Sequence, residues 1–127
     1  MVDPVKKEAS LTRHFKTVFP FRMNHHHTLF GGFAMQWMDE VAFICATRYS
    51  KKRLVTLGSE KIVFLKPVWE SDFAEVLAFV EKVGNKSISV KVEIWSEKMY
   101  EEKREKCVEG FVSFVAVDEN GNSVSIE

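Results

Sequence analysis

The sequence has no excess of charge of either sign, few cysteines and no long hydrophobic run. Lys plus Arg and Asp plus Glu both number 18, so the net charge is zero, and no basic tail or face indicates a nucleic-acid partner. The two cysteines, Cys45 and Cys107, are far apart and lack the spacing of metal ligands. No apolar run reaches membrane-spanning length, and the polar N-terminus does not resemble a signal peptide. We therefore expect a cytoplasmic protein without membrane or nucleic-acid partners.

The chain has enough apolar sequence to fold as one domain. Hydrophobic residues make up 46% of its 127 residues, and 11 residues are Phe. This composition fits a globular protein and argues against disorder. No repeat and no linker rich in Pro, Gly or Ser divides the chain. We predict a single domain over residues 1–127, in which residues 1–12 form a loose N-terminal arm.

A buried helix is predicted from Gly32 to about Ser50. Apolar side chains recur there at spacings of three and four, and further apolar residues fill much of the remaining circumference. The helix is expected to end near Ser50, because the basic residues 51–53 that follow should lie outside the core. The residues at helical spacing are Phe33, Trp37, Met38, Val41, Ile44, Cys45 and Tyr49, and those that widen the face are Met35, Ala42 and Phe43.

One strand is predicted before this helix and four after it. The first covers residues 13–20, and the later segments are 54–68, 73–84, 87–97 and 105–118, with turn signals at 84–86 and at Asn120-Gly121. The clearest strand is 87–97, where apolar and polar residues alternate, so one face should be buried and the other mostly wet. Its apolar positions are Ile88, Val90, Val92 and Ile94, and its polar face carries Ser89, Lys91, Glu93 and Trp95.

This order of elements predicts an α+β fold, in which one curved antiparallel sheet of about five strands wraps around the long helix. A single sheet cannot cover a helix that is apolar all round, and it leaves its edge strands exposed. We therefore expect a homo-oligomer, at least a dimer.

Asp39 interrupts the apolar helix and is the first candidate for chemistry. Its neighbours at helical spacing are small or apolar, with Gln36 as the only nearby polar side chain. A carboxylate in that setting loses hydration unless it is paired or opens onto a cavity, which suits a general base. Two other interpretations fit the same spacing. Asp39 bonds to a backbone amide or a neighbouring chain, or it points to solvent from an uncovered stripe.

The residues just upstream suggest the other half of a site. Gly31-Gly32 before a helix leaves its first backbone N–H groups open to a ligand oxygen, as in an oxyanion hole, although a tight turn is an alternative reason for two glycines. Asn24 offers an amide that can orient a water or a substrate carbonyl. The three histidines at 25–27 point in different directions on an extended loop, and no second cluster completes a ligand set, so we expect no metal site.

These residues resemble a family. The pattern N-x5-F-G-G-F-A-M-Q-W-M-D-E-V-A at 24–42 resembles the signature of hotdog-fold acyl-CoA thioesterases, in particular the cytosolic acyl-CoA hydrolase group of bacteria and mammals. The segments EKIVFLKPVWESD at 60–72 and VGNKSISVKVEIWSE at 83–97 are similar to two further motifs of that family. The resemblance covers roughly residues 13–118, which is most of the chain.

The resemblance implies a helix wrapped by a curved sheet, with chains paired into dimers and often into trimers of dimers. It implies that Asn24 of one subunit faces Asp39 of its partner. Asp39 then activates a water, or acts as nucleophile, against the thioester carbonyl of an acyl-CoA, and the N–H of Gly32 stabilises the oxyanion. The expected reaction yields a free acid and coenzyme A and belongs to fatty acid metabolism.

The resemblance also suggests where the coenzyme A part of the substrate is held, and no other cofactor is expected. The suggested contacts are Gly84, Asn85, Lys86 and Ser87. A turn that binds no ligand explains these four residues equally well. Two departures from the family pattern stand out: His26-His27-Thr28 replaces a small polar run beside the site, and Ser71 replaces the usual Gly before Asp72.

Two other functions remain open at this stage. A hotdog dehydratase needs a catalytic His paired with a carboxylate, but the helix has no His, and only the histidines at 25–27 could supply one. A non-catalytic acyl-CoA-binding protein would carry the same ligand site. Replacing Asp39 with Asn distinguishes an enzyme from such a binding protein. An enzyme with this change should lose turnover but still fold and bind coenzyme A.

Overall fold

A computed structural model describes residues 1–127 and contains five strands, a long helix and a short one. The sheet is antiparallel throughout, in the order β1-β3-β4-β5-β2. In chain order the elements are α1 (Pro4–Ser10), β1 (Thr12–Thr17), the 3-10 helix η1 (Pro20–Arg22), α2 (Gly31–Ser50), β2 (Leu54–Phe64), β3 (Asp72–Val83), β4 (Ser87–Lys98) and β5 (Arg104–Ala116).

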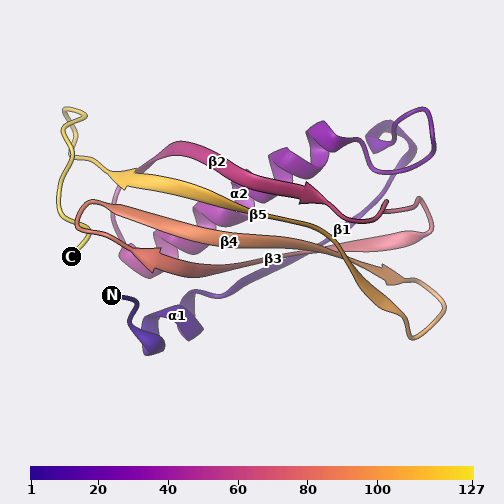
Figure 1. Cartoon of the computed structure of the whole chain (residues 1–127), viewed down its shortest axis with the longest axis horizontal. Helices are drawn as coiled ribbons and strands as arrows, with labels where there is room; N and C mark the ends of the chain where they lie inside the picture. Colours follow the sequence, from indigo (N-terminus) through magenta and orange to yellow (C-terminus); the bar gives the residue numbers. More distant parts are fainter.

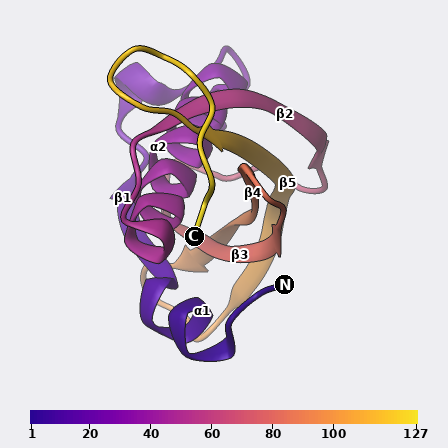
Figure 2. The ribbon, with the colours of Figure 1, turned by 90° about the vertical axis from the view of Figure 1, so that its left-hand side faces the viewer.

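The sheet curves around α2, which lies along its concave side (Figures 1 and 2). The predicted alternation of β4 is confirmed on this side, because Ile88, Val90, Val92 and Ile94 are all fully buried against the helix. Small residues on β3, among them Ala74 and Ala78, are buried too and let the helix approach closely. The expected hotdog arrangement, one long helix inside a curved antiparallel sheet of five strands, is confirmed.

The N-terminal residues are not the loose arm that the sequence predicted for 1–12. Pro4–Ser10 form α1, and the carboxylate of Asp3 caps it by accepting the backbone N–H groups of Val5 and Lys6. The helix is tied to α2, because the N–H of Asp3 donates to the hydroxyl of Tyr49 at 2.8 Å. A capping Asp followed by Pro is a helix-start signal, and these contacts with α2 stabilise a helix too short to form alone.

The outer face of the sheet is also drier than predicted. Glu93 on β4 is only 9% exposed and lies between the ammonium groups of Lys91 and Lys106. On β3, Glu75 is buried and accepts from Arg104 at 2.8 Å. The alternation identified this face correctly, but ion pairs within and between strands remove the carboxylates of Glu75 and Glu93 from water.

One side of the helix is left uncovered in the single chain, as expected of a helix that one sheet cannot enclose. A stripe on α2 that includes Met35, Asp39 and Phe43 is exposed. It borders β2, an edge strand whose residues are exposed almost throughout, with Leu57 exposed to 68%. An exposed apolar stripe beside an open strand edge indicates a contact with another protein chain. No helix is both long and apolar enough to cross a membrane.

Both cysteines are expected to be unreactive in the folded protein. Cys45 and Cys107 are fully buried, and burial raises the pKa of the Cys45 thiol to about 11, which keeps it protonated near neutral pH. We expect a disulfide reagent that reports thiols to find less than about 0.1 thiol per chain within minutes. In guanidinium chloride it should find both. Rapid reaction of either thiol in native buffer would contradict this packing.

Candidate active site

Asp39 lies on the exposed stripe of α2, two turns beyond the start of the helix. Its only hydrogen-bond partner is the hydroxyl of Thr56 on β2, which donates to Oδ1 at 3.4 Å. The carboxylate thus has one weak bond, free lone pairs and an open approach from the uncovered side. The spacing along the helix allowed several interpretations of Asp39. In the single chain it lies on an uncovered stripe of α2, beside the edge strand β2.

The start of α2 presents backbone donors with no partner. Phe30 is the N-cap and makes no side-chain capping bond. The first hydrogen bonds of the helix are those from the N–H groups of Phe33 and Ala34 to the carbonyl of Phe30. The N–H groups of Gly31 and Gly32 precede them and find no acceptor in the chain. The helix dipole adds partial positive charge there, so this end suits an oxygen that becomes negative.

The two glycines differ in how much room their surroundings leave for a side chain. A Cβ on Gly32 would lie 2.5 Å from the ring of Phe30, so any other residue would push that ring aside. A Cβ on Gly31 would make only ordinary contact with the ring of Phe64, at 3.7 Å. Neither glycine has a positive φ. The tight-turn explanation, which needs a positive φ, therefore does not apply, and the absence of a Cβ at Gly32 leaves room for the ring of Phe30.

Asn24 organises the loop that leads into this helix. Its Oδ1 accepts from the N–H groups of His26 at 2.8 Å and of Thr28 at 3.2 Å, and its Nδ2 donates to the Thr28 hydroxyl at 2.9 Å. One hydrogen of Nδ2 remains for a ligand, since an amide nitrogen has two. Asn24 can therefore donate to a substrate carbonyl or to a water, while its carbonyl oxygen is occupied within the loop.

One cavity brings Asn24 and Gly31 together, but neither Gly32 nor Asp39 lines it. It has a volume of about 460 Å³ and lies between the loop and the end of β2, lined by Asn24, Thr28, Gly31 and Phe64 among others. Asp39 is seven residues beyond Gly32, which is about 10 Å along the helix axis. Within one chain, therefore, the amide and the free N–H groups form one half of a site, and Asp39 and Thr56 form another.

The turn predicted to contact coenzyme A lies at the other end of the molecule. Gly84–Ser87 join β3 to β4, and Ser87 pairs with Val115, next to the start of β2 and the C-terminal end of α2 (Figure 1). The carbonyl of Asn85 accepts from the N–H of Ile126, and Nζ of Lys86 donates to the Ser123 hydroxyl at 3.4 Å. The single chain does not bring this turn to Asn24 or to Gly32.

The histidines lie on the exposed side of the loop. The rings of His25 and His26 are 3.9 Å apart between centroids, and His27 lines a cavity of about 510 Å³ with Trp69 and Met99. No group of three or more His, Cys, Asp or Glu side chains is placed to hold a metal ion.

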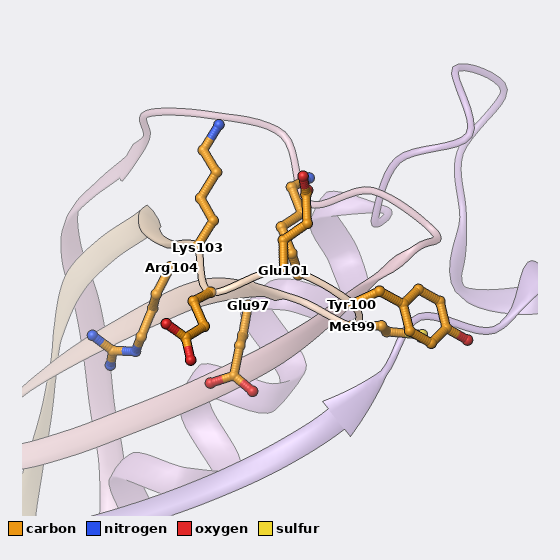
Figure 3. A pocket seen from close by; sticks show the side chains of 8 residues that line it. Glu97, Met99, Tyr100, Glu101, Lys103 and Arg104 are labelled. Carbon is orange, nitrogen blue, oxygen red and sulfur yellow. The ribbon is translucent and has the colours of Figure 1, made fainter.

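A further cavity, of about 520 Å³, lies on the hairpin between β4 and β5 and is lined by Glu97–Arg104. Figure 3 shows charged side chains at its rim and Tyr100 pointing away from it. It contains none of the site residues predicted from the sequence. The residue that sequence reasoning missed is Thr56, since a hydroxyl on an irregular strand carries no local signal of its own.

Comparison with known proteins gives a consistent picture. Residues 26–103 match a family described as the thioesterase superfamily. A protein of Bacillus subtilis, named as an uncharacterised acyl-CoA thioester hydrolase, is 37% identical over 109 residues, which are 86% of this chain and 63% of that protein. The chain thus spans less than two thirds of the length of that relative.

Solved structures extend the likeness to the fold. An acyl-CoA hydrolase from Bacillus cereus has a TM-score of 0.91 at 36% identity, over 94% of this chain and 73% of that one. An acyl-CoA hydrolase of Staphylococcus aureus, solved with butyryl coenzyme A, coenzyme A and coenzyme A disulfide, has a TM-score of 0.89 at 32% identity, over the same shares of the two chains. The same enzyme has been solved with a Thr, an Asp or an Asn changed to Ala.

A thioesterase from Yersinia pestis, described as hexameric, has a TM-score of 0.81 at 29% identity, over 91% of this chain and 93% of that one. The family match covers more than half of the chain, and the hotdog arrangement agrees with that of the solved relatives. This chain belongs to the thioesterase superfamily.

Proposed function

We propose that the protein hydrolyses an acyl-CoA thioester to a free acid and coenzyme A, in a site shared between two copies of the chain. The observation that carries this proposal is the pair of complementary half sites. One offers unpaired N–H groups at the start of α2, and the other offers an exposed carboxylate on the uncovered stripe of the same helix. The names of the related proteins and the coenzyme A bound to one of them support the choice of substrate.

The spacing of the altered residues in the Staphylococcus aureus structures supports the assignment of roles. In that enzyme the changed Asp lies 15 positions after the changed Asn, and the changed Thr lies 17 positions after the Asp. Asn24, Asp39 and Thr56 have the same two intervals. We therefore assign these three residues to the site, Thr56 as the group that orients the Asp39 carboxylate.

The reaction follows from what each group can do. Asp39 takes a proton from a water whose oxygen attacks the thioester carbon, and the carbonyl oxygen becomes negative. The N–H of Gly32 and the free hydrogen of the Asn24 amide donate to that oxygen. The carbon–sulfur bond then breaks, the acid is released, and the coenzyme A thiolate takes up the proton. A direct attack by the carboxylate of Asp39 would instead form an anhydride that water hydrolyses.

The oligomer that we propose is a two-fold dimer formed through the edges of β2 and the exposed stripes of α2. A two-fold axis perpendicular to the two helices runs them antiparallel, so the start of one helix approaches Asp39 of the other. The same pairing covers Leu57 and Phe43 and supplies the missing partner of the strand edge. The hexameric relative supports a further assembly of three dimers.

The antiparallel arrangement also gives the turn Gly84–Ser87 a role. Because this turn lies at the C-terminal end of α2, the partner's copy of it approaches the substrate that enters at the start of the helix. We propose that its polar groups, Lys86 in particular, contact the phosphates of coenzyme A. This contact requires Lys86 to leave the Ser123 hydroxyl, an exposed bond of 3.4 Å.

The first experiment is an assay of the purified protein with a series of acyl-CoAs of increasing chain length, in which the released thiol is counted. If the proposed function is correct, thiol is released, and the rate is highest for acyl-CoAs within some range of chain length. Binding of coenzyme A without hydrolysis would favour the acyl-CoA-binding protein. Loss of the double bond of an enoyl-CoA without thiol release would favour the dehydratase.

Thr56 offers a further test, because its hydroxyl donates the only hydrogen bond that the Asp39 carboxylate accepts. Thr56→Val removes the hydroxyl and keeps the shape, so we expect kcat to fall about 3- to 10-fold, the usual worth of one such hydrogen bond. Thr56→Ser retains the hydroxyl and should stay near the wild-type rate. Equal rates for Val and Ser would exclude this role.

A further inference from the structure

We propose that Asp72, paired with Lys98, is a positioning residue that holds the segment from Asn24 to Gly31 in place for the reaction. This inference rests on the proposed function, since it concerns the half of the site that binds the carbonyl oxygen. Asp72 itself makes no hydrogen bond to Asn24 or Gly31. It acts through a turn, and the chain of contacts has four steps.

The first step is the burial of the carboxylate. The side chain of Asp72 is 0% exposed, although it carries a charge. Its Oδ1 accepts from Nζ of Lys98 at 2.8 Å. The hydrogen bond to this carboxylate raises the pKa of Lys98, so the ammonium stays charged. A buried carboxylate is stable only with such partners, and therefore its place is closely defined.

The second step joins this carboxylate to a turn. Oδ2 of Asp72 accepts from the backbone N–H of Trp69 at 3.1 Å, and the backbone N–H of Asp72 donates to the carbonyl of Trp69 at 3.0 Å. Asp72 thus closes the turn between Pro67 and β3 with two hydrogen bonds to Trp69, one from its side chain and one from its backbone. The Lys98 ammonium anchors the turn to the next strand, since Asp72 and Lys98 lie opposite each other in the sheet.

The third step joins the turn to the loop before α2. Thr28 and Trp69 form an antiparallel bridge, and the N–H of Leu29 donates to the carbonyl of Val68 at 2.8 Å. Thr28 and Leu29 are both buried, so this short pairing lies out of water. The turn held by Asp72 is therefore the surface on which the loop rests.

The fourth step reaches the site. The N–H of Asn24 donates to the carbonyl of Thr28 at 2.8 Å, and its amide nitrogen donates to the Thr28 hydroxyl at 2.9 Å. In the other direction, only Leu29 and Phe30 separate Thr28 from Gly31. A shift of Thr28 therefore moves the amide of Asn24 and the free N–H groups at the same time.

The expected consequence is a loss of turnover without an equal loss of binding. Asp72→Asn keeps an acceptor for the Trp69 N–H but removes the charge that holds Lys98. We expect kcat to fall about 10- to 100-fold, as displacements near 1 Å do at a reacting centre. KM should change little, because coenzyme A is held elsewhere. Lys98→Met, in a side chain that is 25% exposed, tests the same link without altering the buried carboxylate.

Glu75 provides the matched control. It lies on the same strand, is 4% exposed in its side chain, and is paired with Arg13 and Arg104 on the outer face of the sheet. Glu75→Gln breaks a buried ion pair of the same kind and should lower the Tm without lowering kcat. If Glu75→Gln and Asp72→Asn reduce kcat alike, the effect is one of stability and the positioning role is wrong.

A double-mutant cycle with Asn24→Ala then separates positioning from general weakening. If Asp72 acts mainly through Asn24 and its loop, Asp72→Asn should reduce kcat much less in a chain that already lacks the Asn24 amide. The loss of Tm should be the same in both backgrounds. Full additivity of the two losses in kcat would overturn the proposal.

Hydrogen exchange gives a result that does not depend on turnover. In Asp72→Asn the N–H groups of Leu29 and Asn24 should exchange faster than in the wild type, and in Glu75→Gln they should not. Unchanged exchange at both N–H groups would overturn the proposal even in an active enzyme. A wild-type protein that hydrolyses no acyl-CoA would refute the proposed function, and the exchange experiment would still decide whether Asp72 anchors the loop.

Discussion

Asp39→Asn is expected to lower kcat for acyl-CoA hydrolysis by about 10²- to 10⁴-fold, the range that a general base contributes. The amide keeps the shape of the carboxylate and can still accept from the Thr56 hydroxyl, but it cannot take a proton from water. Because Asp39 is exposed on the single chain and has one weak bond, the free energy of unfolding should change by less than about 0.5 kcal/mol.

Glu40→Gln is the control for the loss of one negative charge. Glu40 is the next residue on the helix, is half-exposed, and contacts only the ammonium of Lys16, at 3.9 Å. Its rate should stay within about a factor of two of the wild type, the effect of a surface ion pair. An Asp39→Asn protein that turns over at a similar rate would remove the base from the mechanism. A single turnover in ¹⁸O-water then distinguishes base from nucleophile, since only a nucleophilic carboxylate takes up the label.

The sequence predicted those parts of the fold that a local pattern encodes. The helix was predicted within one residue of its ends, because its apolar spacing and its two leading glycines are features of that segment alone. The strict alternation of β4 likewise identified its buried face. The resemblance pointed to Asn24, Gly32 and Asp39, and the structure shows the free N–H groups and the open carboxylate that such roles need. Their joint action remains a prediction.

The parts that the sequence did not predict depend on contacts between distant segments. The helix α1 has only seven residues, too few to show a period, and the Tyr49 hydroxyl and the Arg48 guanidinium of α2 hold its ends. Glu93 on the outer face of β4 is buried because Lys106 of β5 pairs with it, which alternation along one strand cannot reveal. The position of Thr56 beside Asp39 arises from the way β2 crosses the helix.

A second result distinguishes a shared site from two separate ones. Asn24→Ala and Asp39→Asn should each abolish most activity, yet a dimer of one chain of each kind should regain one intact site. That site combines Asn24 of the Asp39→Asn chain with Asp39 of the Asn24→Ala chain. Random pairing of equal amounts makes half of the dimers mixed, so about a quarter of the wild-type activity should return. If Asn24 and Asp39 of the same chain formed one site, every site in the mixture would lack one of the two residues, and no activity would return.

The double variant Asn24→Ala with Asp39→Asn provides the opposite test. In a dimer with a wild-type chain, each site lacks one residue, so wild-type chains that pair with the double variant lose activity. An equal mixture made by co-expression should therefore show about half of the activity that its wild-type chains have alone. A mixture that keeps all of that activity would place Asn24 and Asp39 in one chain's site. In that case the 10 Å that separates Gly32 from Asp39 along the helix would have to be spanned within one chain.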